Sequence, residues 1–186
     1  MIEFEPFQKI PRLFRDMVVT EKIDGTNAQV YVSEGGEVVA GSRKRWITPE
    51  NDNYGFAAWV LEHRDELSTL GPGKHYGEWW GCGIQRRYGL DEKRFSLFNV
   101  KRWNEEPVPR CCNVVPVLHS GLFDLAMVRG VMEELRGRGS VASPGFMQPE
   151  GVVIYLPASN QLFKATLEKD EQPKSVGQIQ MSKRMK

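Results

Sequence analysis

The sequence predicts an α+β fold in which mostly antiparallel strands are covered by two helices. Three observations predict it. Short segments alternate between apolar and polar residues, which is typical of strands. A Gly-Gly pair joins two of these segments, and glycine accepts the positive φ that a tight hairpin turn requires. Two longer segments carry apolar residues at helical spacing.

Strands are expected, in sequence order, at residues 29–33, 38–42, 74–80, 94–100, 114–118, 151–156 and 161–166. The first two flank the turn at Gly35 and Gly36, and the last two form a hairpin around residues 157–160. The pair at 74–80 and 94–100 is rich in aromatic residues.

Each helix is predicted from one apolar face. The first is expected over residues 51–70, with a face formed by Phe56, Trp59, Val60, His63 and Leu67. The second is expected over residues 123–136, with a face formed by Leu125, Val128, Met132 and Leu135. Glycine-containing segments end both helices.

Length and composition indicate one domain. The 186 residues, 40% of them hydrophobic, are enough for one good core. We expect a domain over residues 1–168, followed by a basic polar tail over residues 169–186. The net charge of +1 excludes a globally basic surface, so contact with a polyanion requires local clusters.

The chemistry of the termini and cysteines excludes several classes. Three cysteines without a CxxC spacing do not form a disulfide framework, and with only three histidines they argue against a zinc site. The N-terminal segment contains Glu3 and Glu5 and no long apolar run, so we expect no signal peptide. No segment has the length of a membrane span, and we expect a cytoplasmic protein without a membrane partner.

Lys22, Ile23, Asp24 and Gly25 form a K-x-D-G motif, which by itself is a weak signal because a surface turn can carry the same Asp-Gly pair. Charged or aromatic residues then follow in expected strands or directly after them: Arg43, Glu78, Phe98, Glu150 and Lys164. Charged residues in apolar strands are costly to bury unless they are paired or bind a ligand. Structural alternatives remain open at this point: Glu78 could pair with Lys74 or Arg86, Lys164 could face solvent, and Phe98 could belong to the core.

Taken together, the ordered set resembles the covalent nucleotidyltransferases, which comprise ATP-dependent RNA ligases, DNA ligases and mRNA capping enzymes. The segment from Glu21 to Asn27 is most similar to phage-type RNA ligases of the RNA ligase 2 kind, and the motifs run from Thr20 to Lys164. The resemblance implies an ATP-grasp-like nucleotidyltransferase domain of antiparallel sheets with packed helices. The length of the chain leads us to expect no OB domain.

The implied activity is that of an ATP-dependent polynucleotide ligase that uses Mg²⁺ or Mn²⁺, in RNA repair or phage defence. A Lys–AMP intermediate forms first, AMP then moves to a 5′-phosphate, and a 3′-hydroxyl attacks to seal the ends. The resemblance favours RNA over DNA as the nucleic acid.

The resemblance also implies a role for each motif residue. By resemblance, Lys22 is the nucleophile, Asn27 is a supporting catalytic residue, and Arg43 contacts the nucleotide and the 5′-phosphate end. Glu78 binds the ribose and Phe98 stacks on the adenine. Glu150 binds the metal and Lys164 contacts the α-phosphate. Thr20 and the backbone beside Glu21 complete the expected nucleotide site. Nucleic-acid contacts are expected from Lys44, Arg45, Arg86 and Arg87, and from the tail residues Lys183, Arg184 and Lys186.

Two positions depart from the family pattern. Asn99 stands where RNA ligases usually carry Asp, and the usual K-x-K motif keeps only Lys164, with Leu162 and Thr166 on either side. Two alternatives therefore accompany the RNA ligase hypothesis: a DNA ligase of minimal form, and a nucleotide-binding or adenylylating module that no longer seals strands. A GTP-using capping enzyme is disfavoured by the Thr26-Asn27 pair.

Overall fold

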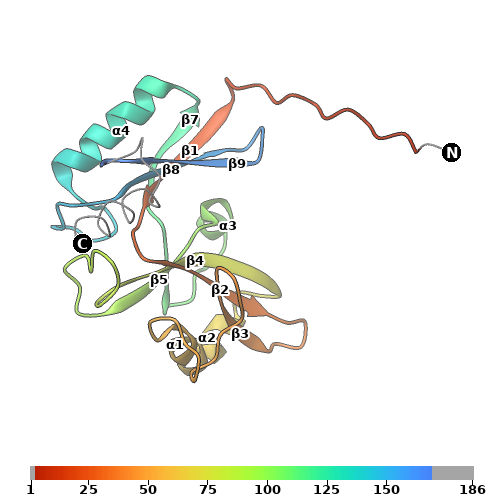
Figure 1. The fold of residues 1–186 in the computed structure, drawn as a ribbon, viewed down its shortest axis with the longest axis vertical. Helices are drawn as coiled ribbons and strands as arrows, with labels where there is room; N and C mark the ends of the chain where they lie inside the picture. The colour runs from red at the N-terminus through yellow and green to blue at the C-terminus, as the bar shows by residue number, and fades with distance from the viewer. Residues whose placement is uncertain (1–2, 169–186) are drawn as a thin grey trace, which may run out of the picture.

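Two β-sheets form the framework of the protein, and helices cover one face of each (Figure 1). The structure, a computed structural model, describes residues 3–168. The four-stranded sheet has the order β7-β1-β8-β9, with β1 at Asp16–Lys22, β7 at Val117–Leu122, β8 at Gly151–Leu156 and β9 at Gln161–Thr166. The five-stranded sheet has the order β3-β2-β4-β5-β6, with β2 at Thr26–Val32, β3 at Val38–Ser42, β4 at Gly73–Gly81, β5 at Lys93–Leu97 and β6 at Cys112–Val114. The helices are α1 at Phe56–Glu62, α2 at Arg64–Ser68, α3 at Val100–Glu105 and α4 at Leu125–Arg138.

The four-stranded sheet packs on α4 through alternate residues of its strands. Asp124 caps this helix, because its carboxylate accepts a hydrogen bond of 2.8 Å from the Ala126 amide. The core between sheet and helix contains Met17, Val19, Val128, Val131, Leu135, Val152, Ile154 and Leu156. Side chains at the intervening positions of β1, including Thr20 and Lys22, therefore lie on the face that α4 does not cover.

The five-stranded sheet forms a larger core with α1 and α2. Ala28, Val30, Trp79, Phe95 and Leu97 point to this side and are almost completely buried. Strand alternation places Asn27, Glu78 and Ser96 on the opposite face, and the register pairs Asn27 with Glu78 and Glu78 with Ser96. One cross-strand row thus carries polar groups from three neighbouring strands.

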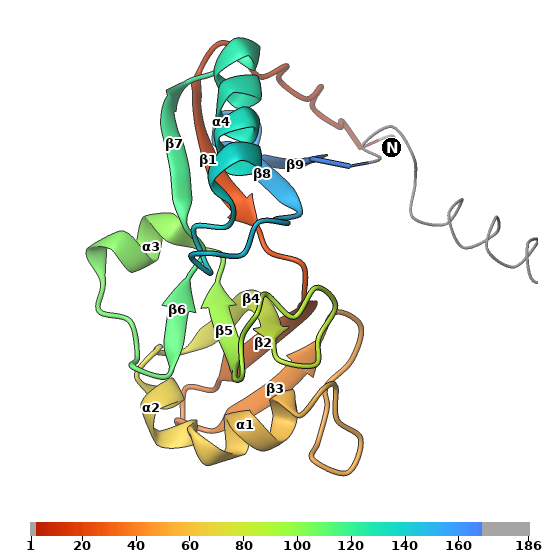
Figure 2. The ribbon, with the colours of Figure 1, turned by 90° about the vertical axis from the view of Figure 1, so that its left-hand side faces the viewer.

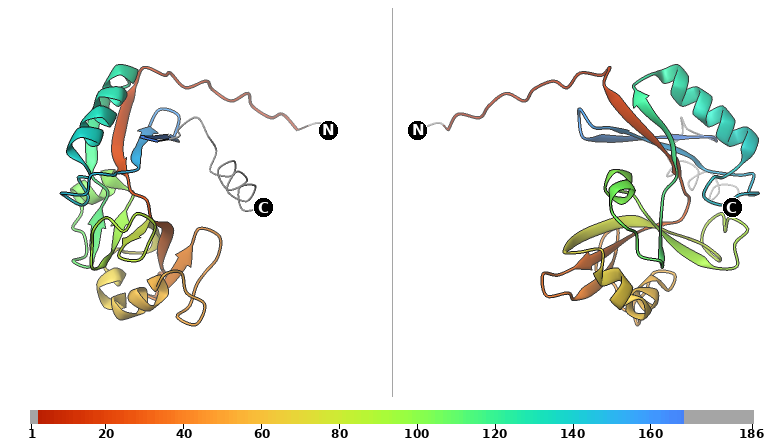
Figure 3. Two further views of the ribbon diagram at one scale, coloured as in Figure 1. Left: turned by 60° about the vertical axis from the view of Figure 1, so that its left-hand side comes forward. Right: turned by 180° about the vertical axis from the view of Figure 1, so that it is seen from behind.

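The uncovered faces of the two sheets lie toward one another. Figure 2 shows α4 at one end of the molecule and α1 and α2 at the other, with both sheets between them. A short link from β1 to β2 joins the sheets, and a small cluster of Ile23, Trp80, Tyr88 and Val115 packs beside this link. Residues 3–13 run away from both sheets (Figure 3). Within residues 3–168, no helix is long and apolar enough to span a membrane.

The expected α+β class is confirmed, and the structure corrects four details. The helix predicted over residues 51–70 is two short helices, since His63 leaves the helical conformation with φ −102° and ψ 15°. The strand predicted over 114–118 is divided into β6 and β7 around Pro116, which has no amide hydrogen to donate. The strand predicted over 94–100 ends at Leu97, and α3 follows it. Finally, the helix predicted over residues 123–136 spans Leu125–Arg138, and Leu125 of its expected apolar face is exposed. Strand pairing is mostly antiparallel, as expected, although β5 and β6 pair in parallel.

Candidate active site

Lys22 and Glu150 form an ion pair where the two sheets meet. Lys22 is the last residue of β1, and its Nζ lies 2.6 Å from Oε2 of Glu150. The pairing of Lys22 with Gly151 explains the contact, because Glu150 directly precedes β8. The Lys22 side chain is 21% exposed and that of Glu150 only 5%. The amine is therefore accessible to a ligand while its charge is balanced by a buried carboxylate.

Glu78 holds the backbone that follows Lys22. Its Oε1 accepts a hydrogen bond of 3.0 Å from the Gly25 amide, and Oε2 accepts one of 3.4 Å from Nδ2 of Asn27. Gly25 passes so close to β4 that a Cβ would lie 2.4 Å from the Trp79 carbonyl oxygen, so only glycine fits at this position. The K-x-D-G segment is thus pressed against β4, and neither Lys74 nor Arg86 pairs with Glu78 among the contacts of residues 3–168 that the structure defines.

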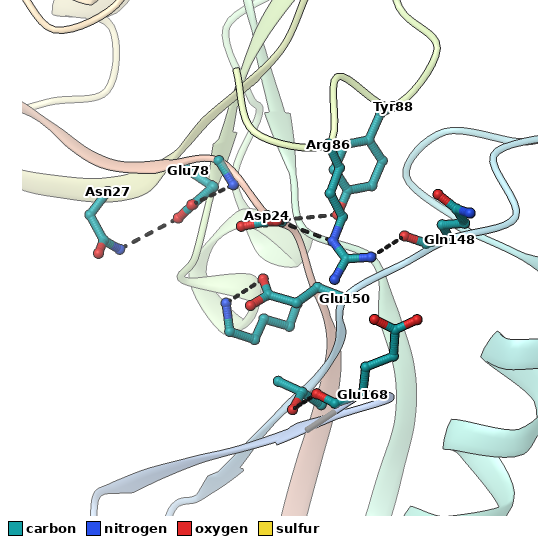
Figure 4. Close-up of polar contacts among 11 residues, drawn as sticks. Asp24, Asn27, Glu78, Arg86, Tyr88, Gln148, Glu150 and Glu168 are labelled. Carbon is teal, nitrogen blue, oxygen red and sulfur yellow. Dashed lines mark hydrogen bonds and ion pairs between the residues drawn. The ribbon is translucent and has the colours of Figure 1, made fainter. Parts of the chain in front are cut away.

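The environment of Glu78 favours its neutral form. The pKa of this carboxyl is raised to about 7 from an ordinary 4.5, mainly by burial and to a smaller extent by the nearby charges of Glu150 and Asp24. Lys22 and the hydrogen bond from Gly25 act in the opposite direction. Because Lys22, Asp24 and Glu150 all influence Glu78, the four groups form one electrostatic unit. Figure 4 labels three of them, Asp24, Glu78 and Glu150.

Glu21 points away from this unit, to the α4 side of the sheet. Its side chain is almost completely buried and accepts hydrogen bonds from Oγ of Ser140 at 2.5 Å and from the amides of Val141 and Ala142 at 2.8 and 2.9 Å. These bonds satisfy a buried charge and fix the segment after α4 to β1. The carboxylate is therefore structural, and only the backbone at Glu21 remains a candidate for nucleotide contact.

Thr20 and Lys164 share the face of the four-stranded sheet that carries Lys22. Val153 pairs with Thr20 on one side and with Lys164 on the other, so the three residues form one row across β1, β8 and β9. Lys22 occupies the next row of the same face. Lys164 is exposed on the edge strand, which fits the solvent-facing alternative and leaves its amine available to an anionic ligand.

Phe98 lies directly after β5 and is 40% exposed, so it does not belong to the core. Its amide donates a 2.9 Å hydrogen bond to the Tyr76 carbonyl, which extends the β4–β5 ladder by one residue and places Phe98 on the Glu78 face. Phe95, by contrast, is completely buried. The next residue, Asn99, caps α3 because its Oδ1 accepts a hydrogen bond of 3.2 Å from the Arg102 amide.

The basic residues expected to contact nucleic acid differ in their surroundings. Arg43 and Lys44 are exposed in the turn that follows β3. Arg45 is also exposed, but its guanidinium donates to Oδ1 and to the backbone carbonyl of Asn51. Arg87 is exposed, whereas Arg86 is partly buried and bonded to Asp24. Residues Lys183, Arg184 and Lys186 lie outside the described part of the chain.

Sequence reasoning missed three contributors to the site. Asp24 was seen as a motif residue without a role of its own, yet its carboxylate accepts from Arg86 Nε at 3.1 Å and its amide donates to the Tyr88 hydroxyl at 2.8 Å. Gln148 takes part through its backbone carbonyl, which leaves no signal in the sequence. Tyr88 had one weak signal, since it is an aromatic residue within a loop rich in glycine and arginine.

The carboxylates fit a metal that arrives with a phosphorylated ligand. Among residues 3–168, no group of three or more His, Cys, Asp or Glu side chains is arranged to hold an ion by itself. Magnesium sites of one or two carboxylates completed by substrate phosphates need no such group. Glu150 beside Lys22 offers a carboxylate of that kind.

The fold thus places this lysine and these carboxylates between two facing sheets. The sequence pattern of the RNA ligase family matches residues 15–166, and the chain belongs to that family. Comparison with curated proteins gives no match.

Solved structures of an RNA ligase from Naegleria gruberi share the fold. A mutant with AMP and Mn superposes with a TM-score of 0.61 at 20% identity, covering 83% of this chain and 50% of the other. A mutant with ATP and Mn gives a TM-score of 0.57 at 22% identity, covering 81% and 49%. An apo mutant gives 0.60 at 20% identity, with the same coverage. The chain therefore spans about half the length of these ligases.

Proposed function

We propose that this chain is the nucleotidyltransferase domain of an ATP-dependent RNA ligase and that Lys22 carries AMP covalently. The observation that carries the proposal is the accessible Lys22 amine, 2.6 Å from buried Glu150, in a chain of the RNA ligase family. The fold relatives from Naegleria gruberi include complexes with ATP or AMP and Mn, which supports a nucleotide and a divalent metal as ligands of this fold. Residues 1–168 would form the domain.

In the first step, the Lys22 amine attacks the α-phosphorus of ATP, a P–N bond forms, and pyrophosphate leaves with the electrons of the broken P–O bond. The amine must first release a proton to solvent and give up its contact with Glu150, so nucleotide binding has to open this ion pair. Glu150 would then hold a metal bound to the phosphates, which neutralises their charge. Lys164, on the same face as Lys22, would add a second cation at the α-phosphate.

The nucleoside would lie along the Glu78 face of the five-stranded sheet. Exposed Phe98 would stack on adenine, and Glu78 in its ionised form would accept hydrogen bonds from the ribose hydroxyls. Thr20 and the backbone of Glu21 are the remaining candidates for contact with the nucleotide. Asn27, which already donates to Glu78, and Arg43 in the nearby turn complete the proposed site.

In the later steps, a 5′-phosphate oxygen attacks the Lys22-bound phosphorus and the lysine leaves. A 3′-hydroxyl then attacks the activated 5′-phosphate, and AMP leaves as the ends are joined. With a net charge of only +1, the domain would bind the strands through local cations, and the exposed side chains of Arg43, Lys44, Arg45 and Arg87 are the candidates. RNA is the proposed substrate because of the family.

Incubation with α-labelled ATP and Mg²⁺ or Mn²⁺ tests the first step, and nicked duplexes with RNA or DNA on either side of the nick test the rest. The proposal expects a labelled protein and sealing of nicks that contain RNA. Preference for all-DNA nicks would support a minimal DNA ligase. Labelling without sealing of any nick would support a module that only adenylylates, and absence of labelling would contradict the proposed function.

A further inference from the structure

Arg86 lies in an unusual loop between β4 and β5. Three residues that are not glycine, namely Gln85, Arg87 and Tyr88, have positive φ values of 44°, 60° and 52°. Such left-handed conformations are uncommon for L-residues and persist where surrounding contacts hold them in place. The loop is therefore held in one shape by its contacts, and those contacts indicate its purpose.

Tyr88 anchors the loop to the link between β1 and β2 and to the segment that precedes β8. The ring is buried and lies 4.6 Å from that of Phe146, between centroids, in the segment that precedes β8. Its hydroxyl accepts a hydrogen bond of 2.8 Å from the Asp24 amide, and its carbonyl accepts one of 2.9 Å from Oγ of Ser143. The position of Arg86 is thus fixed relative to the K-x-D-G segment and to the segment that leads to Glu150.

Arg86 connects the same two segments through its guanidinium. Its Nε donates to Oδ2 of Asp24 at 3.1 Å, and its Nη1 donates to the carbonyl of Gln148 at 3.0 Å (Figure 4). Asp24 is two residues after Lys22, and Gln148 is two residues before Glu150. A planar guanidinium fixes the spacing of its two partners, which a single ammonium group does less well.

We propose that Arg86 is a positioning residue for nucleotidyl transfer: by bridging Asp24 and Gln148 it sets the Lys22 segment against the Glu150 segment. The proposal rests on the proposed function and assigns Arg86 to the lysine-adenylylation step, whereas its exposed neighbour Arg87 remains a candidate for nucleic-acid contact. The Arg86 side chain is 28% exposed and that of Asp24 16%, so the bridge lies in a partly desolvated place where charge pairing is stronger than at the surface.

The bridge also affects the electrostatic unit around Glu78. The charges that act on this carboxyl are those of Lys22, Glu150 and Asp24. Arg86 balances the Asp24 charge, so its loss leaves more uncompensated negative charge beside Glu78. If ribose binding uses the ionised carboxylate, the acidic limb of the adenylylation rate should move to higher pH when Arg86 is removed.

The test compares single-turnover adenylylation and sealing of a pre-adenylylated nick in wild type, Arg86→Ala, Arg86→Lys and Arg87→Ala, with exposed Arg64→Ala as the neutral control. Arg86→Ala should slow adenylylation at saturating ATP by between about tenfold and about a hundredfold, because misplaced reacting groups cost rates of this order. The acidic limb of the pH–rate profile for adenylylation should move to higher pH in Arg86→Ala only. Arg86→Lys should be intermediate, Arg87→Ala should slow sealing, and Arg64→Ala should match wild type. If Arg86→Ala does not fold, Arg86→Lys carries the test.

Wild-type adenylylation in Arg86→Ala would overturn the proposal, and if sealing alone were lost, Arg86 would be a nucleic-acid contact. A wild-type adenylylation rate in Arg86→Lys would also overturn it, since charge without a bridge would then suffice.

Amide hydrogen exchange of the ligand-free protein provides a readout that does not depend on activity. Arg86→Ala should increase exchange around residues 22–26 and 147–151, and unchanged exchange there would contradict the bridge. Failure of the wild type to label with ATP would contradict the proposed function, while the exchange experiment would still decide the bridge.

Discussion

Replacing Glu78 by glutamine should stabilise the protein at alkaline pH, because the pKa of this buried carboxyl is raised to about 7 from an ordinary 4.5. A raised pKa means that the folded state binds the proton more tightly than the unfolded state does. The resulting contribution to stability is present in full below pH 4.5 and is lost as the pH rises through about 7. Above that pH the folded protein contains a buried carboxylate with incomplete compensation.

The interval between the two pKa values corresponds to roughly 3 kcal/mol at about 1.4 kcal/mol per pH unit. Nearly all of this cost is present at pH 8, and only about 1 kcal/mol of it at pH 5. Glutamine has the same size and shape as glutamate, and its side-chain carbonyl can accept a hydrogen bond from the Gly25 amide. Its side-chain NH₂ can donate to Asn27 once the Asn27 side-chain amide rotates by about 180° to present its oxygen. Relative to wild type, Glu78→Gln should therefore gain about 2 kcal/mol more unfolding free energy at pH 8 than at pH 5.

Urea denaturation at pH 5 and pH 8 measures this difference, and Glu34→Gln, in the exposed β2–β3 turn, is the matched control. Glu34→Gln should show no comparable dependence on pH. A Glu78→Gln effect that is equal at both pH values, or a loss of stability at pH 8, would refute the reasoning. The same variant should bind ATP more weakly, because the ribose loses an ionised acceptor.

Three further predictions concern single side chains and salt. Phe98→Ala should weaken ATP binding by roughly 1–3 kcal/mol in a titration, with little change in stability. Phe95→Ala should instead lower the unfolding free energy by about 3–5 kcal/mol, because Phe95 is buried. An equal loss of stability in both variants would contradict the assignment of Phe98 as the exposed stacking residue. Asn99→Ala should cost about 1 kcal/mol through loss of the α3 cap, and Asn99→Asp should not; thermal melts of the two variants compare them. The rate of sealing a pre-adenylylated nick should fall more steeply with salt concentration than the rate of Lys22 labelling, because only strand binding releases counterions. Arg87→Ala should reduce the salt dependence of sealing. Identical salt curves for the two steps would argue against strand binding by this domain.

Sequence reasoning reached the parts of the site that short motifs encode. Lys22 and Glu150 are 128 residues apart and still meet, because β1 and β8 are adjacent strands and each residue stands at a strand end. Glu78 was singled out only as a charged residue in an aromatic strand, and the strand register then places it on a polar face of β4 and β5. Phe98 is exposed on that face, and its role as an adenine platform stays a prediction.

The remaining features depend on tertiary contacts that leave little trace in the sequence. Asp24 and Arg86 are 62 residues apart in a contact between a turn and a loop, where no periodic pattern applies. The helix predicted over residues 51–70 began too early, because Asp52 instead accepts from the Ala57 and Ala58 amides and marks a later start. Its apolar face is correct, but the break at His63 depends on local backbone geometry that spacing alone does not reveal.

The central claim is that Lys22 carries AMP, and mapping the adenylylated residue tests it most directly. The protein is incubated with ATP and Mn²⁺, digested, and analysed by mass spectrometry, with folded Lys22→Ala protein and GTP in place of ATP as controls. We predict an AMP adduct on the peptide that contains Lys22, no adduct in Lys22→Ala, and a clear preference for ATP over GTP. An adduct on another residue, or persistent labelling of folded Lys22→Ala protein, would contradict the account.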